Sequence, residues 1–224
     1  MRRRALLGRA PIPGSDRLLE LYRHGDDCSI VVPGRGELMS TRRHASEDAL
    51  GRLPCEMLPS ADAARVLIGG LGMGFTLAAA LAAVGPDSRV VVAELVPEIV
   101  EWNRGPLGEH SGHPLSDSRT AVHHGDVAEL LRDRARRFDV VALDVDNGPE
   151  GFGSPGNDWL YSAEGIGCAR DSLRPGGVLA YWSATPDRRF AKRLRECGLR
   201  LSERSVHAHG TRGPKHVIWL ARAS

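Results

Sequence analysis

Apolar residues follow a regular pattern from Arg65 to the end of the chain, where short apolar runs alternate with amphipathic stretches at helical spacing. This alternation is typical of a parallel sheet covered by helices on both faces. Strands are predicted at Val66–Gly69, Val90–Glu94, Thr120–His123, Val140–Asp144 and Val178–Trp182. Helices are predicted at Phe75–Val84, Pro97–Arg104, Val127–Arg136, Ala163–Leu173 and Arg188–Cys197. Two final runs, Leu199–His207 and Lys215–Arg222, predict an antiparallel hairpin that completes a mostly parallel, seven-stranded sheet.

The first 60 residues have a different pattern, with short alternating runs between glycine, proline and charged residues. Three small strands are predicted at Leu18–Tyr22, Cys28–Val32 and Glu37–Thr41, followed by a short helix at Ser46–Leu50. We therefore expect an α/β protein with a small β-rich cap over residues 1–60 and a Rossmann-like domain over residues 61–224.

Composition places few further limits on this picture. The chain has 224 residues, of which 42% are hydrophobic and 26% charged, enough for one well-buried domain with a small appendage. A net charge of +2 does not indicate nucleic-acid binding, and no apolar run approaches the length needed to cross a membrane. The basic start of the chain contains an apolar run of only Ala5–Leu7, which argues against a leader peptide. The four cysteines form no C-x-x-C pair, so we expect reduced thiols and a cytoplasmic protein.

A glycine-rich turn follows the first strand of the regular region. Gly70, Gly72 and Gly74 alternate with Leu71 and Met73, between an apolar strand and the start of a helix. Such a turn lets backbone N–H groups and a helix N-terminus approach a ligand without obstruction by Cβ atoms. A dinucleotide fingerprint needs glycine five positions after its first glycine, and Phe75 occupies that place. The turn, including Met73, is therefore predicted to bind S-adenosylmethionine or a close relative.

Carboxylates follow three of the predicted strands. Ligands of open α/β sheets bind outside the carboxyl ends of the strands, where the strand order reverses. Glu94 is predicted to accept hydrogen bonds from a ribose diol, and Asp126 to accept one from an adenine amino group while capping the next helix. Asp144 is the strongest catalytic candidate, because a carboxylate there can position an amine and help to remove its proton.

Asp146 and Asn147 are further catalytic candidates, although Asp146-Asn147-Gly148 could be only a turn. The glycine-rich stretch Gly151–Tyr161 is predicted to be a loop that covers the site. Trp159, Tyr161 and Trp182 are candidates for a substrate pocket, although each alone is more typical of a core. No metal site is expected, because the nine histidines form no metal-binding motif.

Several segments together resemble the spermidine synthase family. They are Val66–Leu77, Val92–Val100, His124–Asp126, Phe138–Asp144, Leu160–Ser162 and Leu173–Leu179. The resemblance implies a class I methyltransferase fold behind a small N-terminal β-domain. It also implies that Glu94 binds the ribose, that Asp126 binds the adenine and that Asp144 deprotonates the attacking amine.

Two positions depart from the family pattern. Met73 stands where the family carries an aspartate that holds the aminopropyl ammonium of decarboxylated S-adenosylmethionine, and Asn147 stands in place of a second aspartate that holds the acceptor amine. A missing carboxylate leaves a cation without a charge-assisted partner. Methyl transfer from S-adenosylmethionine to a small-molecule amine or similar nucleophile is therefore expected ahead of polyamine aminopropyl transfer from the decarboxylated form. A cofactor-binding protein without catalysis is a third alternative, no nucleic-acid or membrane partner is expected, and a homodimer stays open.

Overall fold

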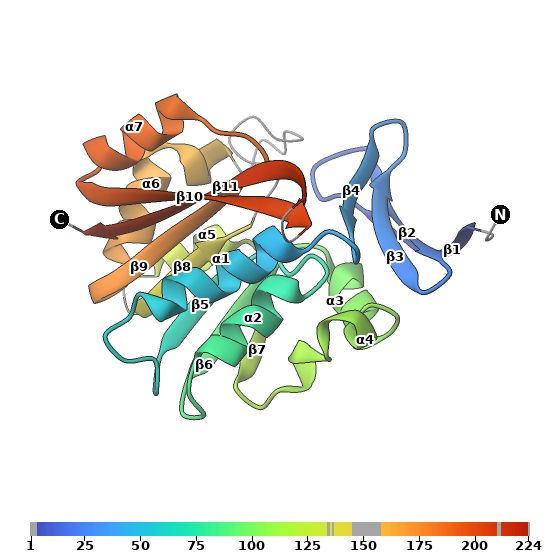
Figure 1. The fold of residues 1–224 in the computed structure, drawn as a ribbon, viewed down its shortest axis with the longest axis horizontal. Coiled ribbons are helices and arrows are strands. Elements are labelled where there is room, and N and C mark those ends of the chain that lie inside the picture. The colour runs from blue at the N-terminus through green and yellow to red at the C-terminus, as the bar shows by residue number, and fades with distance from the viewer. Residues whose placement is uncertain (1–3, 134, 136, 145–157, 210–211, 224) are drawn as a thin grey trace.

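Two sheets organise the molecule. The structure, a computed structural model, describes the chain except for residues 1–3, 134, 136, 145–157, 210–211 and 224. A four-stranded antiparallel sheet stands beside a seven-stranded sheet, with helices on both faces of the larger one (Figure 1). The α/β fold class, the mostly parallel large sheet and the N-terminal β-structure are confirmed.

The small sheet has the strand order β1-β2-β3-β4. Its strands are β1 (Arg4–Pro11), β2 (Leu18–His24), β3 (Asp27–Val32) and β4 (Gly36–Ser40). The sequence pattern predicts the last three but misses β1. Most side chains of β1 are exposed, with Leu6 and Leu7 among them, so this edge strand lacks the alternation of buried and exposed residues that marks a half-buried strand.

The large sheet has the order β10-β11-β9-β8-β5-β6-β7. Its first five strands along the chain are β5 (Arg65–Gly69), β6 (Arg89–Glu94), β7 (Thr120–His124), β8 (Phe138–Leu143) and β9 (Leu173–Ser183). These pair in parallel, whereas β10 (Leu199–His209) and β11 (Arg212–Ala223) form the predicted antiparallel hairpin, with β11 also antiparallel to β9. The chain proceeds from β5 to β6 on one side and returns to β8 on the other, so the strand order reverses at β5.

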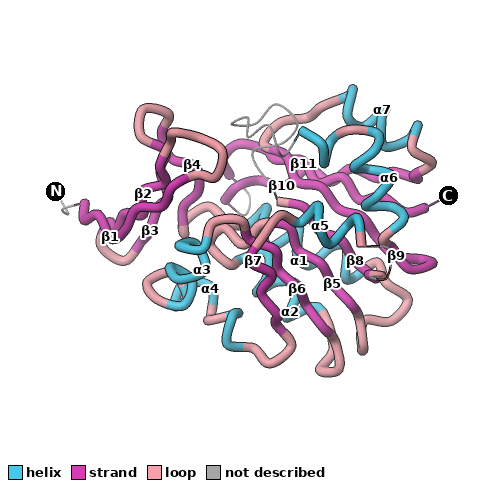
Figure 2. The backbone as a smooth tube through the Cα atoms, turned by 180° about the vertical axis from the view of Figure 1, so that it is seen from behind, coloured by secondary structure: helices cyan, strands magenta, loops and turns pink. Residues whose placement is uncertain are grey.

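Helices cover the two faces of the large sheet because alternate strand residues point to opposite sides. The helices are α1 (Ala45–Glu56), α2 (Phe75–Ala83), α3 (Pro97–Arg104), α4 (Gly108–Ser111), α5 (Val127–Arg132), α6 (Ala163–Asp171) and α7 (Arg188–Glu196). Two short 3-10 helices lie at Pro114–Ser116 and Asp158–Tyr161. In β5, Val66 and Ile68 belong to a core shared with α1, α2 and α3, whereas Leu67 packs into a core shared with α5, α6 and α7. Figures 1 and 2 view these two faces in turn.

The helix α1 runs much further than the predicted Ser46–Leu50 and packs along α2 (Figure 1). The two helices approach closely at Gly51, where a Cβ atom would lie 2.2 Å from the carbonyl oxygen of Thr76. Only glycine allows the two helices this approach. Although α1 falls within the first 60 residues, it also contacts β9, β10 and β11 and so joins the core of the large sheet. In contrast, α5 ends before the predicted Arg136, since Asp133 is extended.

Candidate functional site

The carboxyl ends of four neighbouring strands meet at one edge of the large sheet. Gly69 of β5 lies in register with Ala93 of β6 and with Leu143 of β8. The backbone N–H of Asp144 donates to the carbonyl oxygen of Gly69, at 2.9 Å. This register places the glycine turn at the point where the strand order reverses, between the ends of β6 and β8, as expected for a ligand site.

The glycine turn has a backbone shape that other residues rarely adopt. Gly70, Gly72 and Gly74 have φ angles of 91°, 52° and 86°. Asn103, a buried residue of α3 to which the sequence analysis gave no role, donates to the carbonyl oxygen of Gly72 at 2.8 Å and so holds the turn from behind. Its signal in the sequence is a polar residue four positions after Ile99, on the apolar side of an amphipathic helix.

Glu94 ends β6 beneath the glycine turn and is only 7% exposed. Its Oε2 accepts from the N–H of Leu71 and its Oε1 from the N–H of Val96, each at 2.9 Å. Burial raises the pKa of this carboxyl, and the backbone hydrogen bonds oppose that rise. Each carboxylate oxygen has further lone pairs, so Glu94 can fix the turn and still accept from a ribose hydroxyl.

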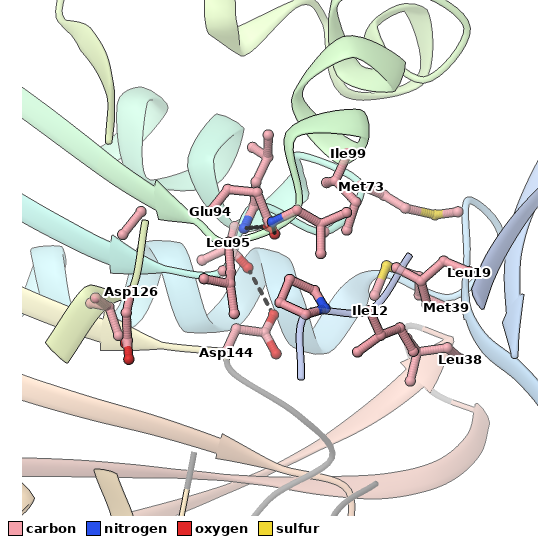
Figure 3. A pocket seen from close by; sticks show the side chains of 18 of the residues that line it. Ile12, Leu19, Leu38, Met39, Met73, Glu94, Leu95, Ile99, Asp126 and Asp144 are labelled. Carbon is pink, nitrogen blue, oxygen red and sulfur yellow. Dashed lines mark hydrogen bonds between the residues drawn. The ribbon is translucent and has the colours of Figure 1, made fainter. Parts of the chain in front are cut away.

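Asp126 and Asp144 lie on the same pocket as Glu94. Asp126 caps α5 through its Oδ1, which accepts from the N–H of Ala128 at 2.8 Å, so the predicted capping role is present. Asp144 follows β8, and its Oδ2 accepts a 3.4 Å hydrogen bond from the Oγ1 of Thr76 in α2. Figure 3 shows Asp126 on one side of the pocket, with Glu94 and Asp144 between it and the N-terminal sheet.

The opposite wall of the pocket is apolar and comes largely from the N-terminal sheet. Ile12, Leu19, Leu38 and Met39 gather there, with Met73 of the glycine turn beside them (Figure 3). Met73 is 5% exposed and belongs to the core that the small sheet shares with α1, α2 and α3. The small sheet therefore closes one end of the pocket with a largely apolar wall.

A fourth carboxylate, Glu47, lines the pocket from the first turn of α1. Its place in a short predicted helix indicates no role in the sequence, because only the packing of α1 on α2 brings it to the strand ends. Burial raises the pKa of its carboxyl, which the hydrogen bond from Ser46 and the charge of His44 lower.

The aromatic candidates separate in the structure. Trp182 of β9 lines the pocket. Tyr161 instead lies in the apolar core between Tyr181 and Phe190, with ring centroids 5.9 and 5.3 Å away. Trp159 packs under the guanidinium of Arg132, 3.8 Å from its ring centroid, and neither it nor Tyr161 is among the described residues that line the pocket. Tyr161 belongs to the core that includes residues of α5 and α6, and Trp159 packs against that core.

Other candidates fall outside the part of the chain that the structure describes. Asp146, Asn147 and the loop residues 151–157 are in this group. Within the described part, no three His, Cys, Asp or Glu side chains are grouped to hold a metal ion. Across the same residues, none of the helices combines the length and apolar character needed to span a bilayer. The four cysteines are free thiols, and Cys28 and Cys55 are buried.

Comparison with known proteins identifies the family. Residues 45–187 match the model of the spermine/spermidine synthase domain. The chain is 28% identical over 165 residues to polyamine aminopropyltransferase 1 of Hyperthermus butylicus, with 72% of this chain and 54% of that protein covered. It is 30% identical over 186 residues to the polyamine aminopropyltransferase of Corynebacterium efficiens, covering 75% of this chain and 34% of the relative. The chain thus spans about half or less of the length of these relatives.

Solved structures share the fold. A spermidine synthase in complex with the transition-state analogue AdoDATO has a TM-score of 0.73 at 16% identity, covering 97% of this chain and 72% of that one. The spermidine synthase from Thermotoga maritima has a TM-score of 0.74 at 17% identity, covering 97% and 73%. At this identity the likeness shows the fold alone, and it agrees with the expected class I methyltransferase fold.

The prediction of methyl transfer is wrong. The matching family model and both relatives belong to spermine/spermidine synthases and polyamine aminopropyltransferases, and none is a methyltransferase. That prediction relied on carboxylates lost at Met73 and Asn147, whereas the described pocket wall carries four, at Glu47, Glu94, Asp126 and Asp144. The two departures therefore leave negative charge in the pocket that can attract cationic substrates. With more than half of its residues matched by the family model, the chain belongs to the spermine/spermidine synthase family.

Proposed function

We propose that this chain transfers an aminopropyl group from decarboxylated S-adenosylmethionine to an amine of the polyamine class. The observation that carries the proposal is the meeting of Glu94, Asp126 and Asp144 in one pocket, within the segment that matches the spermine/spermidine synthase domain. The named activities of the relatives from Hyperthermus butylicus and Corynebacterium efficiens support the same reaction.

The order of polar groups along the pocket suits the donor. Asp126 would accept from the adenine amino group and Glu94 from the ribose hydroxyls, so the nucleoside lies over the glycine turn. The sulfonium then lies toward Asp144, and the aminopropyl chain extends toward Met73 and the apolar wall. Van der Waals contact with Met73 suits the methylene groups of that chain.

Asp144 would orient the acceptor and take its proton. The nitrogen lone pair of the neutral amine attacks the aminopropyl carbon next to the sulfonium, forming the C–N bond. The C–S bond breaks and its electron pair returns to sulfur, which leaves neutral 5′-methylthioadenosine. The nitrogen loses one proton to the Asp144 carboxylate, which releases it to solvent. Thr76 holds this carboxylate through its hydroxyl, so positioning supplies a large part of the rate.

A product assay tests the proposal. The purified chain is incubated with decarboxylated S-adenosylmethionine and a panel of amines, with S-adenosylmethionine as the matched alternative donor. Mass spectrometry should find 5′-methylthioadenosine and an acceptor enlarged by one aminopropyl group only with the decarboxylated donor. Absence of 5′-methylthioadenosine with every amine tested would overturn the proposal.

A further inference from the structure

We infer that Glu47 forms, in the pocket that contains Asp144, a subsite that holds the non-reacting ammonium group of a cationic amine acceptor. The inference rests on the proposed function, which assigns the pocket to an amine. It adds a residue of α1, from outside the strand ends, to the binding of that amine.

The packing of α1 on α2 directs Glu47 into the site. Glu47 and Gly51 are four residues apart and so share one face of α1. Gly51 packs directly on the backbone of Thr76, and the Thr76 hydroxyl donates to Asp144. The face of α1 that carries Glu47 therefore packs against α2, whose Thr76 hydroxyl donates to Asp144. Both carboxylates line the same pocket.

A second contact fixes the start of α1 over the start of α2. His44, which precedes α1, stacks on Phe75, the first residue of α2, with ring centroids 4.0 Å apart and planes 12° apart. Glu47 lies between this stack and the Gly51 contact, so its position in the pocket is defined on both sides.

The Glu47 carboxyl is also oriented by a chain of polar contacts. The Ser46 hydroxyl, which is fully buried, donates to Glu47, and the Ser46 oxygen lies 2.8 Å from Nδ1 of His216. Because the serine has one proton and gives it to Glu47, His216 must carry the proton on Nδ1 and donate to Ser46. His216 packs edge-on against Trp182, which lines the pocket, with ring centroids 4.8 Å apart.

An acidic residue in the first turn of a helix ordinarily interacts with the positive end of the helix dipole. That role does not explain the polar contacts around Glu47. Asp48 occupies the same turn and fulfils that role on the surface, where it pairs with His44 at 2.8 Å. Glu47 instead turns into a pocket that already contains Asp144. Two carboxylates that share a poorly solvated site repel one another, and a bound ammonium relieves both that repulsion and the cost of burial.

The charge balance of the pocket favours a cation over a neutral acceptor. Glu47, Glu94, Asp126 and Asp144 line it, and Arg17 of the connection between β1 and β2 contributes one positive charge to the described wall. Glu94 is committed to backbone amides and Asp126 to a helix cap. Glu47 and Asp144 therefore remain for the two ends of the acceptor, and the class of ligand is a di- or polyamine with a methylene chain and a protonated non-reacting end.

Calorimetry tests the subsite without requiring turnover. The probe is 1,4-diaminobutane, titrated into the chain saturated with 5′-methylthioadenosine, with Glu47→Gln as the variant. Glutamine keeps the size of the side chain and can still accept from Ser46. Glu56→Gln is the matched control, since Glu56 lies on the same helix, pairs with Arg52 at the surface and is half exposed.

We expect Glu47→Gln to weaken diamine binding by about tenfold or more, as the loss of a charge-assisted contact implies, with Glu56→Gln unchanged. Binding of 5′-methylthioadenosine alone should be the same in all three proteins, which shows that the fold and the nucleoside site are intact. Equal diamine affinity in the wild type and Glu47→Gln overturns the subsite, and so does failure of the wild type to bind the diamine. Either result leaves aminopropyl transfer itself to the separate product assay.

Discussion

Gly74 offers a sharp test of how the glycine turn is held. The residue precedes α2 with a φ angle of +86°, and a Cβ atom there would lie 2.7 Å from Oδ1 of Asn103 and 2.8 Å from Oγ of Ser111. Gly74→Ala therefore combines backbone strain with a steric clash. Gly112→Ala is the matched control, because Gly112 has a φ angle of +76° and open space around its Cβ position.

The two costs can be separated. Alanine in the left-handed region costs about 1–2 kcal/mol, which applies to both variants. Forcing a methyl group against buried atoms adds about 1–3 kcal/mol, which applies only at Gly74. We therefore expect Gly112→Ala to lose about 1–2 kcal/mol of unfolding free energy and Gly74→Ala about 2–5 kcal/mol.

Urea denaturation of the wild type and both variants measures these losses, and calorimetry measures binding of 5′-methylthioadenosine. Asn103 also holds the Gly72 carbonyl, so its displacement should weaken nucleoside binding in Gly74→Ala alone. The reasoning fails if Gly74→Ala is no less stable than Gly112→Ala and binds the nucleoside as well.

Three further predictions address other parts of the molecule. Glu94→Gln should abolish the thermal stabilisation given by 5′-methylthioadenosine, because an amide nitrogen would face a backbone donor and distort the glycine turn; an unchanged shift in Tm would contradict this. Iodoacetamide should label Cys168 well before Cys55 in peptide mapping of the native protein, since burial raises the pKa of the Cys55 thiol to about 12; equal labelling rates would argue against that burial. Hydrogen bonds from Arg119 lower the pKa of Asp117 from its ordinary 3.8 to about 2. The pair therefore contributes its full stabilisation above pH 3.8, and this contribution is lost as the pH falls through 2. Asp117→Asn should therefore be less stable than the wild type at neutral pH, and in urea melts the difference should shrink to a small fraction of that value as the pH is lowered to 2.

The sequence predicts the large sheet well because its signal is local. Alternate residues of the central strands face two different helical layers, so β5, β6 and β8 are mostly apolar runs, which end at Gly69, at Glu94 and directly before Asp144. The positions of Glu94, Asp126 and Asp144 follow from that pattern, since the ends of parallel strands share one edge. The edge strand β1 carries no such signal, because its side chains are mostly exposed.

The rest of the site depends on contacts between distant segments. Glu47 and Asn103 reach the glycine turn and the pocket only through the packing of α1 and α3, for which no local spacing exists. The sequence does not distinguish Tyr161 from Trp182 as a candidate for the pocket. In the structure Tyr161 packs in the apolar core, whereas Trp182 lines the pocket. Met73 alone does not decide which group is transferred, because carboxylates from other segments line the same pocket.

The most direct test of the account is the release of 5′-methylthioadenosine from decarboxylated S-adenosylmethionine by the wild type and by Asp144→Asn, with 1,4-diaminobutane as acceptor. Asparagine keeps the shape of the side chain and the contact with Thr76 but cannot take a proton. We predict amine-dependent release by the wild type and a loss in kcat of about 10²-fold or more in the variant, with 5′-methylthioadenosine binding retained. Equal rates in the two proteins would contradict the role of Asp144 and the mechanism built on it.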